Sequence, residues 1–245
     1  MISCAVHQPN FFPRSSTLAK LFRADIWVVL DDVQFNARDY QHRARLAPLS
    51  APDAQEWLTL PVHRPHGRAS RIDELRLVDP DRSMKHLDQL VRHRYRRSAH
   101  WAGTNACVAK VLAALEVSDR IADVAETSTL ALLSALGWPG TVVRSSTLDA
   151  RCGRSVRLAD LTKAVRADTY LCGPGGSKYL DETPFADAGI TVSYPPPPAW
   201  SREPGTRSLS ALWAMAVFGP ATLREELAVH DVVRPSPFPA IAGPS

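Results

Sequence analysis

The stretch ISCAVHQPNFFPRSSTLAKLFRADIWVVLDD, residues 2–32, decides the fold class of this chain. It opens with a short apolar run, residues 2–7, which is typical of a strand, and the apolar spacing of SSTLAKLFRA, residues 15–24, predicts a helix. IWVVLDD, residues 26–32, is typical of a fully buried strand that ends in two carboxylates. A strand, a loop, a helix and a strand in this order predict the beginning of a parallel α/β sheet.

The same pattern returns in the second half of the chain. Residues 141–194 alternate strand-like runs (TVVRSS, TYLCG, ITVSY) with helix-like segments. Between the two halves, residues 43–49 and 56–63 are extended and interrupted by prolines, which indicates antiparallel or edge strands. From about residue 82 to 138 the apolar spacing becomes helical.

These segments predict a single domain with an insertion. We expect an α/β fold, a mostly parallel three-layer Rossmann-like sheet over residues 1–225, with a helical insertion at about residues 82–138. Prolines gather in residues 226–245, which predicts a Pro-rich C-terminal tail.

The composition is that of an ordinary globular protein. The chain has 245 residues, of which 45% are hydrophobic and 22% charged, and this length allows one large core. The net charge of +4 indicates either anionic partners or simply a basic surface. No basic leader and no apolar run of membrane-spanning length is present, so we expect a cytoplasmic protein with no membrane partner. The cysteines lack zinc-site spacing, which predicts no metal ligands and reduced, mostly buried thiols at Cys4, Cys107, Cys152 and Cys172.

The loop HQPN, residues 7–10, follows the first predicted strand, where ligands of parallel sheets bind. His7 can act as a general base, and Gln8 and Asn10 can donate to a developing oxyanion. Pro9 and Pro13 restrict the backbone and hold these side chains in place. The alternative is a turn in which Asn10 only bonds the neighbouring backbone.

A second polar group follows the second predicted strand. Asp31 and Asp32 could orient a histidine or bind a substrate amine, although adjacent strand residues point to opposite faces. Gln34, Arg38 and Arg43 come next, and arginine suits phosphate or carboxylate. We predict that Asp32 is catalytic and that the other four bind substrate. For either arginine, ordinary surface charge is the alternative.

The loop GPGGSKY, residues 173–179, follows a later strand. Gly175 and Gly176 allow the backbone to approach an anion, and Lys178 and Tyr179 add groups that can bind substrate. A tight strand-to-helix turn would need glycines equally. The spacing is that of neither a P-loop nor a dinucleotide fingerprint.

A predicted helix within the insertion carries a basic stripe of Lys85, Arg92 and Arg96. The stripe could contact a polyanion such as a tRNA acceptor stem, or it could be a solvated helix face. No nucleic-acid signature accompanies it, and we expect no DNA partner.

The motifs AVHQPNFFP, ADIWVVLDDVQF, EWLTLPV and GPGGSKYLDETPFADAGITVSY resemble those of the WbqC-like family, in order from residue 7 to about residue 220. Two departures make a changed substrate plausible. Tyr40, Gln41 and His42 stand where the family has a Trp–Asn pair, and Trp213 stands where it has an aspartate.

The resemblance implies a bacterial protein of surface-glycan or specialised-metabolite biosynthesis. It favours a transferase that forms an amide by moving an acyl or aminoacyl group onto the amine of a small molecule. The donor could be an acyl-CoA, a carrier-bound acyl group or an aminoacyl-tRNA, and no motif specifies a cofactor or an oligomeric state. His-x-x-Asn is similar in layout to the phosphate-binding loop of adenylating enzymes, so an ATP-dependent ligase is an alternative. A non-catalytic substrate-binding module is the other.

Overall fold

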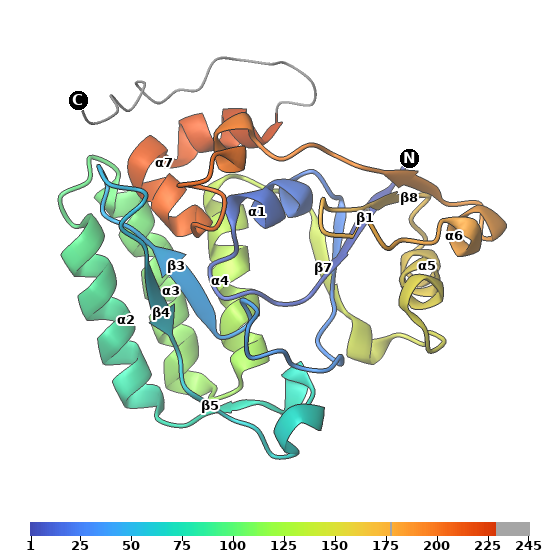
Figure 1. Cartoon of the computed structure of the whole chain (residues 1–245), viewed down its shortest axis with the longest axis horizontal. Coiled ribbons are helices and arrows are strands. Elements are labelled where there is room, and N and C mark those ends of the chain that lie inside the picture. The colour runs from blue at the N-terminus through green and yellow to red at the C-terminus, as the bar shows by residue number, and fades with distance from the viewer. Residues whose placement is uncertain (177, 229–245) are drawn as a thin grey trace.

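A computed structural model describes residues 1–176 and 178–228 of the chain (Figure 1). The helices and strands follow in this order: β1 (Ser3–His7), α1 (Ser15–Phe22), β2 (Ile26–Val29), β3 (Arg43–Leu46), β4 (Glu56–Thr59), β5 (Val62–His63), β6 (Arg76–Leu77), α2 (Pro80–Tyr95), α3 (Trp101–Val117), α4 (Ile121–Ala135), β7 (Thr141–Arg144), α5 (Arg154–Ala164), β8 (Thr169–Leu171), α6 (Thr183–Asp187), β9 (Thr191–Ser193) and α7 (Ala211–Ala228). Within these described residues, no helix is long and apolar enough to cross a membrane.

The central sheet has five parallel strands in the order β7-β2-β1-β8-β9. β1 lies in the middle, and its residues 4–7 pair with residues 26–29 of β2. Apolar residues run almost without interruption through β1 and β2, because both faces of a parallel sheet are covered. The direction in which strands are added reverses between β1 and β8, as in doubly wound nucleotide-binding folds.

Side chains of the sheet enter two separate cores. Ala5 and Trp27 pack into the core that contains α1 and α4, whereas Val6 and Val28 pack against residues of α5 and α6. Successive strand residues point to opposite faces, so one strand contributes to both cores. Figure 1 shows α1 and α4 on one side of the sheet and α5 and α6 on the other. The predicted three-layer, mostly parallel α/β fold is confirmed.

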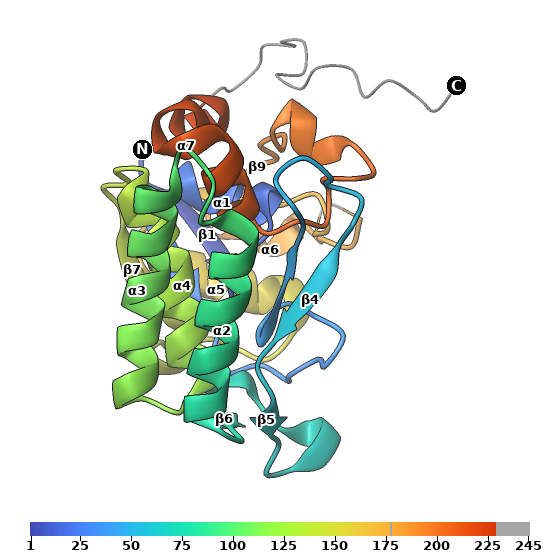
Figure 2. The same ribbon diagram turned by 90° about the vertical axis from the view of Figure 1, so that its left-hand side faces the viewer.

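The insertion lies between β2 and β7 and begins earlier than the predicted helical region. β3 and β4 form the expected antiparallel hairpin, and β5 pairs with β6. The helices α2, α3 and α4 follow and pack side by side, as Figure 2 shows. The chain leaves the sheet directly after β2, so these hairpins belong to the insertion together with the three helices.

The periodicity of the sequence predicts no helix in the region of α7, which packs on α1 and α3. The first half of α7 is buried on nearly all sides, so its sequence lacks the polar face that reveals an amphipathic helix. The helix kinks at Gly219, whose φ is 76°, just before Pro220. Of the predicted tail, residues 226–228 belong to α7, and residues 229–245 lie outside the described part of the chain.

The cysteines are all free, as expected, and Cys4, Cys107 and Cys172 are buried while Cys152 is exposed.

Candidate functional site

A cleft of about 970 Å³ opens where β1 and β8 end, at the point where strand order reverses. Ligands of open α/β sheets bind in this crevice because the diverging connections leave space between adjacent strand ends. His7 and Gln8 line the cleft from the β1 side. Gly175 and Gly176 line it from the β8 side. The structure therefore brings two of the three predicted loops together.

The HQPN loop is fixed by the insertion. The carbonyl oxygen of Asn10 accepts hydrogen bonds from the hydroxyls of Ser128 (3.3 Å) and Thr129 (2.9 Å) in α4. The backbone N–H of Phe12 donates to Ser128 Oγ over 2.7 Å. Gln8 is held through its Oε1, which accepts from Gln41 Nε2 at 2.6 Å. The loop is thus oriented by side chains more than thirty residues away in sequence.

His7 lies between Lys20 and Asn10. Lys20 Nζ is 3.2 Å from Nδ1 of the ring, and the Asn10 side-chain nitrogen is 3.2 Å from Nε2. Burial lowers the pKa of His7 well below its ordinary value, and the charges of Lys20 and Arg14 lower it further. The ring is therefore neutral and carries one proton.

A neutral ring accepts at one nitrogen and donates at the other. The Lys20 ammonium can only donate, so Nδ1 is the acceptor and Nε2 carries the proton. Nε2 then needs an acceptor, which Asn10 supplies when its carboxamide turns its oxygen toward the ring. That oxygen is otherwise buried without a partner among the described residues. Asn10 thus fixes the tautomer of His7.

Lys20 is a site residue that is not among those predicted from the sequence. It lies in the last turn of α1, is 6% exposed, and donates from Nζ to the carbonyl oxygen of Val6 at 3.1 Å. Burial lowers its pKa from 10.5 to about 8, although the nearby thiols of Cys172 and Cys4 act in the opposite direction. The sequence did contain a signal, because Ser16 and Lys20 are four residues apart and share one face of the helix.

The glycine loop closes the other side of the cleft. A Cβ on Gly176 would lie 2.8 Å from Cys172 Sγ, so this position has room only for glycine. Lys178 and Tyr179 also line the cleft, and the guanidinium of Arg154 lies 5.4 Å from the centre of the Tyr179 ring. Gly175, Gly176, Lys178 and Tyr179 all line the cleft, and their binding roles stay predictions.

The structure does not bring Asp31 and Asp32 into the lining of the cleft. Asp31 is buried and accepts from Ser145 Oγ (3.2 Å), Ser146 N (3.1 Å) and Ser146 Oγ (2.8 Å). Asp32 accepts from Ser145 Oγ at 2.6 Å and pairs with Arg157 of α5. The two carboxylates thus connect the end of β2 to the turn after β7 and to α5. Asp32 was predicted to orient His7, but Lys20 and Asn10 are the residues that contact the His7 ring.

Gln34, Arg38 and Arg43 also lie outside the cleft lining, because the chain after β2 turns into the insertion. Gln34 Nε2 donates to the carbonyl oxygen of Arg68 at 2.7 Å, and Arg38 is exposed. Arg43 lies 4.1 Å from the centre of the Trp57 ring and donates to the Asp39 carbonyl. Their predicted contacts with substrate gain no support from this geometry.

Two of the departures from the family pattern contact residues of the cleft. The Tyr40 ring lies 4.7 Å from the guanidinium of Arg14, and Gln41 bonds Gln8 as described above. Trp213, in contrast, is fully buried and donates from Nε1 to the Pro48 carbonyl. If these departures change the substrate, the change is therefore expected to act through Tyr40 and Gln41, which contact cleft residues, and not through Trp213.

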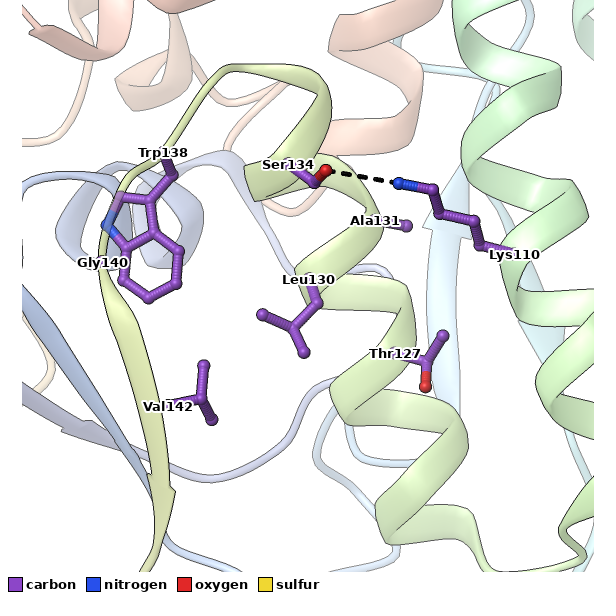
Figure 3. Close-up of a pocket in the computed structure, with 8 residues that line it drawn as sticks. All are labelled: Lys110, Thr127, Leu130, Ala131, Ser134, Trp138, Gly140 and Val142. Carbon is purple, nitrogen blue, oxygen red and sulfur yellow. Dashed lines mark hydrogen bonds between the residues drawn. The ribbon is translucent and has the colours of Figure 1, made fainter.

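Other hollows offer less chemistry. A hollow of about 410 Å³ lies beside α4 and β7, and Lys110 Nζ donates to Ser134 Oγ at 3.3 Å there. Figure 3 shows the residues that line it. Its described lining contains no histidine and no carboxylate. On α2, Arg92 of the basic stripe pairs with Asp88, which reduces the net charge of that face. Nowhere in residues 1–176 and 178–228 do three or more His, Cys, Asp or Glu form a group that could hold a metal.

Comparisons with known proteins agree with the resemblance in the motifs. A model of the WbqC-like protein family matches residues 8–224. The chain is similar to the curated "Uncharacterized protein Rv1507c" of Mycobacterium tuberculosis, with 25% identity over 216 residues that cover 87% of each chain. No solved structure matches the chain. The family match spans the cleft loops, the insertion and most of α7, and the chain belongs to the WbqC-like protein family.

Proposed function

We propose that this protein is a transferase that forms an amide, moving an acyl or aminoacyl group from an activated donor onto an amine-bearing sugar or metabolite. The observation that carries the proposal is the neutral His7 held between Lys20 and Asn10 at the end of β1. The biosynthetic setting is the one implied by the WbqC-like family.

Amide formation needs a base, because the attacking amine loses a proton as its nitrogen bonds to the carbonyl carbon. Lys20, with a pKa of about 8, exchanges its proton near neutral pH. When Lys20 has released its proton to solvent, the Nδ1 lone pair of His7 becomes available to the amine. His7 takes the amine proton at Nδ1 as the C–N bond forms, and this proton then passes to the leaving thiolate or alkoxide as the C–S or C–O bond of the donor breaks.

The carbonyl oxygen gains negative charge during the attack and needs a donor. Gln8 lines the cleft, and its Oε1 is engaged by Gln41, so its Nε2 is the end that can donate to the oxyanion. Asn10 contacts Nε2 of His7 and is not among the residues that line the cleft, so its role in this proposal is to orient the His7 ring.

An ATP-dependent adenylating ligase is the second candidate. The glycine loop and the cations of the same cleft also suit the phosphates of a nucleotide. The two candidates differ in whether product formation consumes ATP.

The test measures amide product by mass spectrometry. The protein is supplied with amino sugars and with acyl-CoA, carrier-bound acyl or aminoacyl-tRNA donors, with and without ATP and magnesium. Product without ATP is the expected result, and AMP release coupled to product would identify a ligase instead. His7→Ala should lower the rate by about 100-fold or more, which is what a general base contributes.

The matched control is His86→Ala, which removes an exposed histidine of α2 outside the cleft. It should leave the rate unchanged, and both variants should melt near the wild-type temperature. A folded His7→Ala protein that supports full pathway function in cells would contradict catalysis and identify a binding module.

A further inference from the structure

The cleft gathers positive charge from segments far apart in the sequence. Six cationic side chains line it: Arg14, Lys20, Arg154, Lys178, Arg202 and Arg207. They come from the start and end of α1, the start of α5, the glycine loop and the segment that precedes α7. Only the folded chain brings them to one cavity.

This charge is not balanced by the protein. Within the described part of the chain, no Asp or Glu lines the cleft, and none of the six cations forms a salt bridge. Arginines elsewhere are paired, for example Arg144 with Asp123 and Glu126, and Arg151 with Asp160. Like charges in one cavity repel each other, and a bound anion removes that repulsion.

Two of the arginines lie over aromatic rings. The guanidinium of Arg14 lies 4.7 Å from the centre of the Tyr40 ring, and that of Arg154 lies 5.4 Å from the Tyr179 ring. Stacking uses the face of a guanidinium and leaves its N–H edge for an anion. The charges are therefore oriented before any ligand arrives.

The size and the apolar lining of the cleft specify the ligand further. A volume of about 970 Å³ lies at the upper end of small-molecule sites. Leu30, Leu158 and Pro197 line the same space, so the ligand has an apolar or ring-shaped part beside its charges. A simple carboxylic acid is too small and carries too few charges for this lining.

We propose that the cleft binds a small molecule through a diphosphate group. The inference rests on the proposed function, since both a CoA thioester donor and a nucleotide-linked amino sugar acceptor carry a diphosphate. The shared chemistry is a diphosphate attached to a nucleoside, with Arg202 and Arg207 among its contacts and His7 at the reacting end. These two arginines are exposed, and Arg202 donates to the carbonyl oxygen of Pro197. Within the described residues, no hydrogen bond joins either of them to His7, Lys20 or Asn10.

Calorimetry on the full chain tests this with CoA, ADP, UDP and inorganic pyrophosphate as probes, and with acetate as the comparison. Tighter binding of CoA than of ADP or UDP assigns the site to the donor, and the opposite order assigns it to a nucleotide-linked acceptor. Arg202→Gln with Arg207→Gln should weaken binding about 100-fold, at roughly tenfold per charge-assisted hydrogen bond. Raising the salt concentration should weaken binding of every diphosphate probe.

The matched control is Arg96→Gln with Arg97→Gln directly after α2, which removes the same charge from exposed residues outside the cleft. It should change affinity less than twofold. Equal losses in the two double variants, or no binding of any diphosphate probe to a folded protein, would overturn the inference. The inference would also be overturned if the cleft bound tRNA and neither pyrophosphate nor CoA displaced it.

The outcomes separate this inference from the proposed function. Diphosphate binding that depends on Arg202 and Arg207, with no amide product from any donor, contradicts the proposed function alone. Amide formation that requires His7, with no diphosphate probe bound, contradicts the diphosphate site alone.

Discussion

Lys20 carries an amine that folding removes almost completely from solvent. Below about pH 8 the folded protein holds this amine as a cation at a cost in solvation. Between about pH 8 and 10.5 the unfolded chain still binds a proton that the folded protein has released. The free energy of unfolding therefore rises with pH across this window, because the unfolded state binds more protons.

Lys20→Met tests this directly, since methionine fills a similar volume without a charge. The stability of Lys20→Met relative to wild type should fall by about 2 kcal/mol from pH 7 to pH 10, as expected from a shift of this size. Urea unfolding at the two pH values measures the difference. Lys163→Met, at an exposed lysine of α5, should give the same difference from wild type at both. A Lys20→Met difference that does not change with pH would contradict the buried charge.

At the scale of elements, the connection between the HQPN loop and α4 determines where His7 points. Phe12 adopts a φ of 42°, which an L-residue rarely adopts without support. Its N–H donates to Ser128 Oγ, and the single hydroxyl proton of Ser128 is shared between the carbonyl oxygens of Ala125 at 2.7 Å and Asn10 at 3.3 Å. The insertion thereby stabilises the loop of the sheet domain.

Ser128→Ala should reduce the free energy of unfolding by about 1–3 kcal/mol, because the buried N–H of Phe12 loses its acceptor. Ser134→Ala makes the same change on an exposed turn of α4 and should cost less than about 0.5 kcal/mol. Thermal melts of both variants provide the comparison. If both variants lost the same free energy of unfolding, the hydrogen bond between Phe12 and Ser128 would contribute nothing beyond the difference in helix propensity between serine and alanine.

At the scale of the whole molecule, α7 joins the insertion to the layer that contains α1. These parts approach each other closely at Gly219, because a Cβ there would overlap the ring of His100, just before α3. Its positive φ adds a second constraint against other residues.

Gly219→Ala should therefore destabilise the protein by about 3 kcal/mol, from both the backbone and the clash with His100. Gly189→Ala is the matched control, because Gly189 has a similar φ of 71° but nothing within 4 Å of an added Cβ. It should lose about 1 kcal/mol, from the backbone alone. Denaturant unfolding measures both values, and similar losses would show that the contact with His100 is easily relaxed.

The sequence by itself determined the features that depend on residues close in the chain. Uninterrupted apolar runs followed by helical spacing identified the parallel α/β class, because these periodicities are set within each element. The same reading located the HQPN and GPGG loops at strand ends, and the motifs identified the family. Among the long helices of the described residues, only α7 was not predicted, because it is buried on nearly all sides and therefore has no polar face in its sequence.

The tertiary structure alone decided which polar groups meet. Strand order brings the ends of β1 and β8 to one cleft, and β2 lies on the other side of β1, with its carboxylates engaged by Ser145, Ser146 and Arg157. Lys20 reaches His7 through the packing of α1 on the sheet, and Arg202 and Arg207 arrive from beyond β9. Such contacts join residues of different elements, and the periodicity within one element carries no information about them.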